Sequence, residues 1–432
     1  MTLRHAASLF ALAAALTATP ALAASKADPA KTVGKLVASP AFKKAVAQLD
    51  ADFDRTVADI VTLTEIPAPP FKEEARAKAY LEMLKAHGLT NVEMDAEGNV
   101  MGVRAGAATK GKGPFVVIAA HLDTVFPEGT DVKVKREGTR LMAPGVGDDT
   151  RALATLLAYL RALDAAGIKT KADILFVGDV GEEGPGDLRG MRHLFNKGPY
   201  KGRISAFFSM DGSDPARIVD KGVGSKRYRV TFNGPGGHSY GAFGIVNPMA
   251  AMGRAVTDLY AVQPPKKPKT TYSASVTGGG TSVNSIPNSV FMEFDMRSES
   301  ADELAKLDAT LIGILDKAVA AENAARSTAP GKVSYDAKVI GERPAGHTDP
   351  KSDIVVLTAA AISALGFTPE HGDSSTDANL PMSLGIPAIT IGAGGKAGRA
   401  HALDEWIDVE KTSSLKGMQV GLAALLAVAG VD

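Results

Sequence analysis

The sequence predicts an α/β fold in which a mostly parallel sheet carries helices and a smaller α+β domain is inserted into it. Continuous apolar strands alternate with helical stretches, as in a parallel sheet buried on both faces; they are PFVVIAA, ADILFVGDV, ISAFFSM and PAITIG. In the middle of the chain, KRYRVTFNG, KTTYSASVTGG and SVFMEFDMRS alternate apolar and polar residues, as half-exposed antiparallel strands do. Helical patterns at residues 245–262 and 301–323 separate these strands, which favours a ferredoxin-like arrangement.

These patterns divide the chain into four parts. Residues 1–23 have a short positive start, an uncharged apolar run and a small-residue cleavage site at Ala21-Leu22-Ala23, which predicts a signal peptide. A first core helix or a membrane anchor is the alternative, but the apolar run is short for a span of roughly 20 residues. The main domain is expected over residues 24–221 and 341–432, with the insertion at 222–340.

The start of the main domain is expected to be helical. Apolar residues recur every three or four positions between residues 24 and 70, until Pro67, Pro69 and Pro70 end that helix. A second helix is predicted over residues 71–87, ended by Gly88. The segments NVEMD and NVMGVRA then predict a strand pair.

Composition excludes several classes of function. The chain has no cysteine, which excludes disulfides, thiol catalysis and thiolate metal sites. Lysine plus arginine equals aspartate plus glutamate at 48 each, so no overall charge favours nucleic acid or an anionic membrane. No stretch after the leader is expected to cross a bilayer, and the apolar run at 422–429 predicts a buried C-terminal helix.

Polar residues follow the apolar strands at their carboxyl ends, where open α/β sheets bind ligands. The candidates for a metal site are His121, Asp148, Glu183, Asp211 and His401. Imidazole nitrogen and carboxylate oxygen suit Zn²⁺ or a similar divalent ion. Two histidines and three carboxylates are too many for one tetrahedral ion with an open position, and they fit two ions that share a bridging carboxylate.

The ordered segments HLDTV, GDD, GEEG, MDG and AHALDEW resemble the metal motifs of the di-zinc superfamily that contains peptidase T, carboxypeptidase G, succinyl-diaminopimelate desuccinylase and the aminoacylases. The resemblance extends from about residue 55 to the C-terminus. It implies that His121 and Asp211 hold one ion, that Glu183 and His401 hold the other, and that Asp148 bridges them. The ions are expected to be Zn²⁺, with Co²⁺ or Mn²⁺ as alternatives.

The same resemblance implies catalytic roles near the ligands. Glu182 is expected to be the general base, and Asp123 is expected to accept the second N–H of the His121 ring and fix its tautomer. Spacing alone leaves the reverse assignment open, with Glu182 as ligand and Glu183 as base. The peptide bond after the bridging aspartate is commonly cis in the family, which points to Asp148–Asp149. The chain departs from the family at Thr150-Arg151-Ala152, where Lys then Gly is frequent, and this weakens the assignment to a subfamily.

The inserted domain supplies further candidates by the same resemblance. His238 in GPGGHS is expected to stabilise the oxyanion of the reaction, reaching the site when the domains close, often from a partner subunit. Asn284 and Arg297 resemble contacts to the polar groups and the carboxylate of the substrate, with a structural sheet-edge arginine as the alternative reading of Arg297. Arg343 and the stretch around Asp377 are also expected on the substrate side. Four other histidines match no motif and are expected to be surface or structural residues: His87, His193, His347 and His371.

The resemblance implies a hydrolase that cleaves an amide bond in a short peptide, and the predicted signal peptide implies that it is exported, to the periplasm or out of the cell. An aminopeptidase of the tripeptidase kind is favoured because Asp211 stands where deacylases and carboxypeptidases of the family tend to have Glu. An N-acyl amino acid amidohydrolase or a carboxypeptidase is the alternative, with an inactive binding or scaffold protein as a remote one. The inserted domain is expected to act as a lid and as a homodimer interface.

Overall fold

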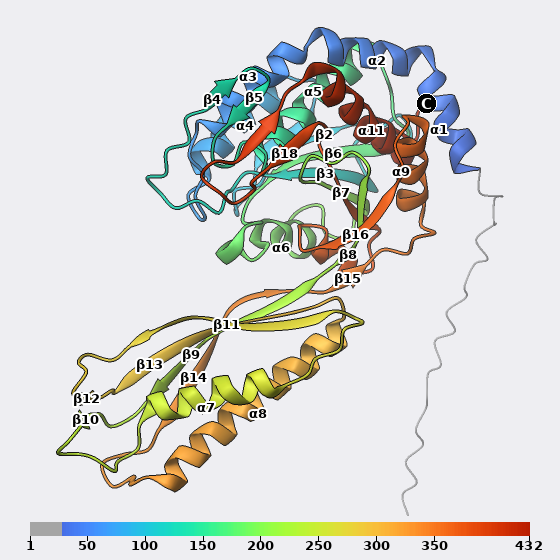
Figure 1. The fold of residues 1–432 in the computed structure, drawn as a ribbon. Helices are drawn as coiled ribbons and strands as arrows, with labels where there is room; N and C mark the ends of the chain where they lie inside the picture. Colours follow the sequence, from blue (N-terminus) through green and yellow to red (C-terminus); the bar gives the residue numbers. More distant parts are fainter. Residues whose placement is uncertain (1–27) are drawn as a thin grey trace, which may run out of the picture.

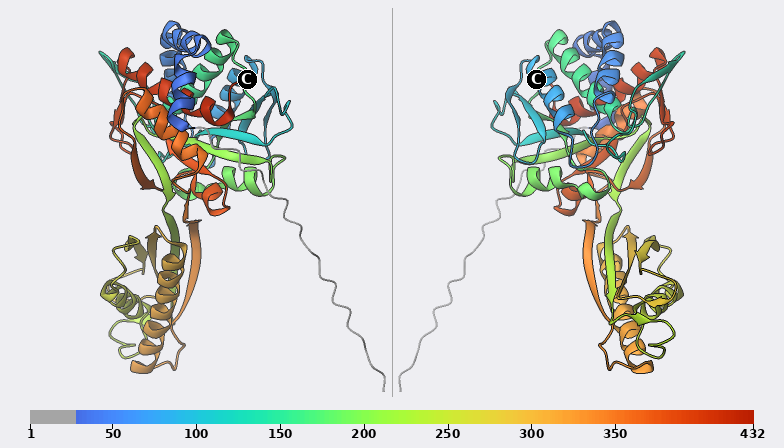
Figure 2. Two further views of the ribbon diagram at one scale, coloured as in Figure 1. Left: turned by 90° about the vertical axis from the view of Figure 1, so that its right-hand side faces the viewer. Right: turned by 90° about the vertical axis from the view of Figure 1, so that its left-hand side faces the viewer.

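The structure is a computed structural model that describes residues 28–432 (Figure 1). The predicted signal peptide, residues 1–23, lies outside the described residues. A larger body of helices around a sheet carries an elongated smaller body, and Figure 2 shows that a few extended strands connect the two. This agrees with the predicted α/β domain that carries an inserted α+β domain.

The main sheet has nine strands and is mixed, with a parallel centre. In spatial order its strands are β1 (Thr90–Met94), β2 (Val100–Arg104), β6 (Asp173–Asp179), β3 (Phe115–His121), β7 (Ile204–Met210), β17 (Ala388–Ile391), β8 (Arg217–Gly222) and β15 (Gly346–His347), and β16 (Glu370–Ser374) pairs with β8. The run β6-β3-β7-β17 is parallel, which confirms the four predicted apolar strands. Strands β1 and β2 form the predicted antiparallel pair at one edge.

Helices cover both faces of this sheet, which explains why its central strands are apolar at every position. Along β3, Val116, Ile118 and Ala120 pack into one core and the alternate residues into the other. The helices of the larger layer are α1 (Pro29–Ala38), α2 (Pro40–Ala51), α3 (Phe53–Thr64), α4 (Glu74–Lys85), α5 (Thr150–Ala166), α9 (Asp353–Ala364) and α11 (Lys411–Ala429). On the other face lie α6 (Arg189–Asn196) and α10 (Asn379–Ser383).

Two sequence-based expectations need correction here. The single helix expected before Pro67 is three helices. Ser39 and Pro40 start the second helix, in which the Ser39 hydroxyl accepts the N–H of Phe42 at 3.2 Å. The chain turns again at Asp52, where the third helix begins. Helix α11 is long and apolar enough to span a bilayer, contrary to expectation, but 67% of that stretch is buried inside the protein. Its burial agrees with the predicted core helix.

The inserted domain is a four-stranded antiparallel sheet with two helices on one face. Along the chain its elements are β9 (Gly224–Asn233), α7 (Pro248–Ala261), β11 (Thr270–Gly279), β13 (Ser289–Ser298), α8 (Ala301–Ala325) and β14 (Ser334–Arg343). The strand order β11-β13-β9-β14 and the helix placement match the predicted ferredoxin-like arrangement. A short pair, β10 (Gly237–His238) with β12 (Ser285–Ile286), lies at the end of this domain that points away from the main sheet (Figure 1).

A second small sheet in the main domain was not predicted. It has the order β18 (Lys396–Gly398), β19 (Trp406–Asp408), β5 (Arg140–Met142) and β4 (Lys135–Glu137). Pairing of Trp406 with Met142 joins the end of the chain to the segment before α5. The loop that carries His401 is thereby held beside the loop that carries Asp148.

Candidate metal centre and active site

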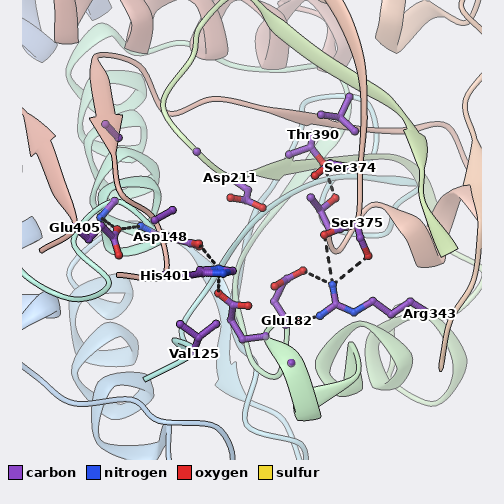
Figure 3. Close-up of a pocket in the computed structure, with 18 of the residues that line it drawn as sticks. Val125, Asp148, Glu182, Asp211, Arg343, Ser374, Ser375, Thr390, His401 and Glu405 are labelled. Atoms are coloured by element: carbon purple, nitrogen blue, oxygen red, sulfur yellow. Dashed lines mark hydrogen bonds and ion pairs between the residues drawn. The ribbon is translucent and has the colours of Figure 1, made fainter. Parts of the chain in front are cut away.

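The strand ends and loops surround one cavity of about 620 Å³ (Figure 3). Strand β3 ends at His121, and the segments after β6 and β7 carry Glu182, Glu183 and Asp211. Asp148 precedes α5, and the loop between β18 and β19 carries His401. Asp148, Glu182, Glu183, Asp211 and His401 all line the cavity, and His121 lies buried directly behind Asp148.

Four of the predicted metal ligands are in mutual contact. The two oxygens of Asp148 face different histidines: Oδ1 lies 2.8 Å from His121 Nε2, and Oδ2 lies 3.1 Å from His401 Nε2. His401 Nε2 also lies 3.0 Å from Glu183 Oε1 (Figure 3). Ligand atoms of His121, Asp148 and Glu183 all lie within 4.8 Å of one another, so these residues could hold a metal ion. This imidazole and carboxylate set fits Zn²⁺ and related divalent ions.

The pKa values of the residues in this cluster indicate that it is suited to bind a cation. Burial, together with the nearby Asp148 carboxylate, raises the pKa of Asp211 to about 6. Hydrogen bonds to Asp148 and Glu183 raise the pKa of His401 to about 10. Burial disfavours ionisation of Asp148, but hydrogen bonds from His121 and His401 outweigh it and lower the pKa of this carboxyl. These carboxylates lie close together and are stabilised by positively charged neighbours, so the cluster is suited to bind a divalent ion.

Asp123 lies where predicted but makes a different contact. The ring Nδ1 of His121 lies 3.0 Å from the backbone carbonyl of Asp123 and 3.7 Å from its carboxylate, which is too far for a hydrogen bond. The carboxylate instead accepts the backbone N–H groups of Gly181 (3.0 Å), Glu182 (3.1 Å) and Glu183 (2.8 Å). Asp123 therefore orients the His121 ring through its carbonyl and fixes the GEEG segment through its side chain.

Glu182 points into the cavity from this segment and is paired with Arg343. The Nη1 group of Arg343 donates to Glu182 Oε1 at 2.9 Å, and its Nη2 group donates to the carbonyl of Glu182 (Figure 3). Arg343 Nη1 also lies 3.3 Å from the Ser375 hydroxyl. Burial raises the pKa of Glu182 to about 8, although the charge of Arg343 opposes this. A carboxyl with such a pKa can exchange protons near neutral pH.

Glu405 is a functional candidate that the sequence analysis missed. Its carboxylate accepts the backbone N–H groups of Gly145 (2.9 Å), Gly147 (2.7 Å) and Asp148 (2.9 Å). Burial raises the pKa of Glu405 to about 7. Glu405 therefore shapes the loop that presents Asp148 to both histidines. Its place four residues after His401, in the segment AHALDEW, was the available signal.

The candidates from the inserted domain separate into two groups. Arg297 and Arg343 line the cavity, the latter at the end of β14. His238 on β10 and Asn284, which directly precedes β12, lie outside the cavity lining. They lie close to each other, because Ser239, the residue after His238, donates its N–H to the Asn284 carbonyl at 2.9 Å. His238 is exposed, and its Nδ1 accepts the backbone N–H of Tyr240 at 3.2 Å. In this structure the inserted domain therefore holds His238 away from the metal ligands (Figure 1).

Several buried acids surround the ligands. The Asp148–Asp149 peptide bond is cis, as the resemblance implied, and Asp149 accepts the N–H of His121 at 3.2 Å. Asp377 and Asp179 are buried, and burial together with the nearby carboxylates of Asp179 and Glu182 raises the pKa of Asp377. His371 contacts Asp220 at 2.6 Å and does not line the cavity, which agrees with a structural role.

Comparison with known proteins identifies the class of protein that this fold and site define. Peptidase family M20/M25/M40 matches residues 117–427, and the chain therefore belongs to this family of metal-dependent hydrolases. A curated relative from Pyrococcus furiosus, whose provisional name is LysW-lysine/LysW-ornithine hydrolase, is 35% identical over 122 residues. That match covers 28% of this chain and 32% of the relative, so the chain matches about a third of the relative's length.

Two solved structures share the fold over nearly their full length. The aminopeptidase PepT from Bacillus cereus is 20% identical, with a TM-score of 0.70 over 87% of this chain and 99% of the other. A tripeptidase from Staphylococcus aureus is 18% identical, with a TM-score of 0.71 over 87% of this chain and 98% of the other. At these identities the likeness shows the fold, and substrate preference has to be argued from the site.

Proposed function

We propose that this chain is a two-metal peptidase that hydrolyses the amide bond of short peptides, most readily as an aminopeptidase. The observation that supports it best is the contact of both Asp148 oxygens with different histidines, because a carboxylate shared in this way is suited to bridge two ions. His121 and Asp211 would hold one ion, and Glu183 and His401 the other. The native ions are proposed to be Zn²⁺, with Co²⁺ or Mn²⁺ as alternatives.

Bound divalent ions would supply a water of lowered pKa and a polarised substrate carbonyl. Glu182 would accept the proton of the attacking water and deliver it to the leaving amine. Its raised pKa and its place beside Glu183 support this role. Arg343 orients Glu182 through one hydrogen bond to its carboxylate and one to its backbone carbonyl. His238 would donate to the oxygen of the tetrahedral intermediate after closure of the inserted domain or from a partner chain.

The aminopeptidase preference rests on Asp211, which stands where deacylases and carboxypeptidases of the family tend to have Glu. A deacylase or carboxypeptidase on the same machinery is the second candidate, because Arg297 lines the cavity and could hold a substrate carboxylate. Asn284 lies outside this cavity and could contribute only after the domains move.

A substrate panel tests the proposal. Protein reconstituted with Zn²⁺, Co²⁺ or Mn²⁺ is assayed on unblocked di- and tripeptides and on matched N-acetyl derivatives. Hydrolysis of unblocked tripeptides with loss of activity on blocked ones supports the aminopeptidase. Activity confined to blocked substrates would establish the second candidate, and no hydrolysis together with no bound metal would point to an inactive binding protein.

Export is a separate part of the proposal. The composition of residues 1–23 supports cleavage after Ala23 and release to the periplasm or medium. N-terminal sequencing of the protein recovered from the exported fraction checks it, and an intact Met1 in the cytoplasmic fraction would contradict it.

A further inference from the structure

The segment that carries the proposed base, residues 182–187, is joined to the inserted domain at both of its ends. At its start, Arg343 Nη1 donates to Glu182 Oε1 at 2.9 Å (Figure 3). At its end, Asp187 Oδ1 accepts the N–H of Glu342 at 2.7 Å. Glu342 and Arg343 are the last two residues of β14. The two hydrogen bonds and the two stretches of main chain therefore form a closed ring that crosses the boundary between the domains.

Arg192 on α6 adds to the contact at Glu342. Its Nη2 group donates to the carbonyl of Glu342 and lies 3.2 Å from Asp187 Oδ2, and its Nε group donates to the Asp187 carbonyl at 2.8 Å. Because β14 lies at the edge of its sheet, its outer main-chain groups are open to such contacts. Asp187 and Arg192 thus bind both the N–H and the carbonyl of Glu342, and we call this pair the clamp.

The main domain holds the other side of the ring in place. The N–H of Leu188 donates to the Gly181 carbonyl at 2.8 Å, which closes residues 181–188 into a loop. The Leu188 side chain is fully buried in the core on one face of the main sheet. The Asp123 carboxylate binds three main-chain N–H groups at the start of the loop. The clamp therefore joins β14 to a part of the main domain that is itself fixed by several contacts.

The clamp lies beside the point where the chain passes between the domains. The two connections, at Val223 and Pro344, are joined by the buried amide of Asn379, whose Nδ2 group donates to both of their carbonyls at 2.9 Å. Any rotation of the inserted domain about this point moves the end of β14 relative to the base. The contacts at the end of β14 therefore determine how the base is held at each position of the inserted domain.

We propose that Asp187 is a positioning residue for the base: as part of the clamp, it holds β14 where Arg343 meets Glu182. The orientation of Glu182 then depends on the position of the inserted domain. The inference rests on the proposed role of Glu182 and adds to it two residues that do not line the cavity, Asp187 and Arg192. Positioning matters because a general base acts only within hydrogen-bond reach of the water that it deprotonates.

Asp187→Ala tests the positioning role. The variant removes the acceptor of the Glu342 N–H, so kcat for a tripeptide should fall by about tenfold, which is part of the loss expected for the base itself. The loss is partial because the Ser375 hydroxyl still lies 3.3 Å from Arg343 Nη1. KM and metal content should change by less than about twofold, since Asp187 lies outside the cavity lining. A loss confined to KM would overturn the proposal.

A conservative substitution and a double-mutant cycle separate positioning from a general structural effect. Asp187→Asn keeps an oxygen acceptor and should keep kcat within about threefold of wild type. In an Arg343→Gln background, Asp187→Ala should change kcat by less than about twofold, because Asp187 acts through Arg343. An undiminished effect in that background, or no recovery in Asp187→Asn, would overturn the proposal.

Asp349 provides a matched control. Its carboxylate also accepts one main-chain N–H, that of Lys351 at 2.8 Å, within the main domain. Asp349→Ala should keep kcat within about twofold of wild type. An equal fall of kcat in Asp349→Ala and Asp187→Ala would mean that loss of such a bond disturbs the main domain as a whole, and it would overturn the positioning role.

A distance measurement separates this proposal from the proposed function. The chain has no cysteine, so spin labels can be attached at Lys44→Cys on α2 and Lys317→Cys on α8, both of which are exposed. The distribution of distances between the labels should be broader in Asp187→Ala than with Asp187 present, and unchanged in Asp349→Ala. A broader distribution without cleavage of any peptide would refute the peptidase and keep the clamp. Peptide cleavage with an unchanged kcat and an unchanged distribution in Asp187→Ala would keep the peptidase and refute the clamp.

Discussion

The side chains at the centre of the site could be found from the sequence because each follows an apolar strand or a glycine-rich turn. His121 ends β3, Asp211 follows β7 directly, and Glu183 lies four residues after the end of β6, so the strand pattern places them at one edge of the sheet. The contacts of Asp123 and Glu405 could not be found in this way. Both carboxylates bind backbone N–H groups of distant loops, and such partners depend on the folded path of the chain.

The role of Glu182 yields a prediction at this scale. Glu182→Gln keeps the size of the side chain and the contact with Arg343 but removes the proton acceptor, so kcat should fall by roughly two to four decades. Metal content, measured by atomic emission, should equal that of the wild type. Metal loss in this variant, with retention in Glu183→Gln, would show that the ligand and the base have been exchanged.

At the scale of elements, long apolar strands and amphipathic helices were predictable, and the small sheet of β18, β19, β5 and β4 was not. Its strands have three residues each and come from segments far apart in the chain, so no local pattern marks them. Yet this sheet brings His401 beside Asp148. The breaks between α1, α2 and α3 lie at Ser39 and Asp52. They were not predicted because the spacing of apolar residues continues across both positions.

The loop that leads into β3 gives a stability prediction. The buried carboxylate of Asp173 accepts the N–H groups of Gly106 (2.7 Å), Gly111 (2.8 Å) and Gly113 (2.7 Å). Burial alone would raise the pKa of Asp173, but hydrogen bonds from Thr109 and these glycines outweigh it and lower the pKa. Asp173→Asn should lower the free energy of unfolding by about 2 kcal/mol at pH 7, because an amide offers one acceptor and turns its own N–H groups toward the donors.

The pH dependence of this loss follows from the direction of the shift. The folded pKa lies below the ordinary value of 3.8, so the stabilisation is present above that value and is lost as the pH falls through the folded pKa. Denaturant unfolding at pH 7 and pH 3.5 should therefore show a smaller difference between wild type and variant at the lower pH. The exposed Asp336 serves as control, since Asp336→Asn should change stability by less than about 0.5 kcal/mol. A pH-independent loss in Asp173→Asn would contradict the assignment.

At the scale of the molecule, the sequence predicted both domains but not how far apart they lie. The inserted domain extends away from the main sheet, and β10 with His238 lies at its far end (Figures 1 and 2). Three arginines lie at the opposite end of the inserted domain and line the cavity: Arg227 on β9, Arg297 on β13 and Arg343 on β14. The inserted domain thus places these three arginines at the cavity of its own chain, while His238 is exposed at the surface away from that cavity.

This arrangement predicts that His238 acts only after closure or across a dimer. In His238→Ala, kcat should fall by about two to three decades while metal content and KM change little, because the contact forms with the oxyanion. If the residue serves a partner chain, mixing His238→Ala with Glu182→Gln chains should restore up to about a quarter of wild-type activity, since hybrid dimers hold one site with both groups. Subunit exchange is verified with differently tagged chains. Full subunit exchange without recovery of activity would mean that His238 acts in the cavity of its own chain, after closure of the inserted domain. Solution scattering with a bound inhibitor would detect this closure as a smaller radius of gyration.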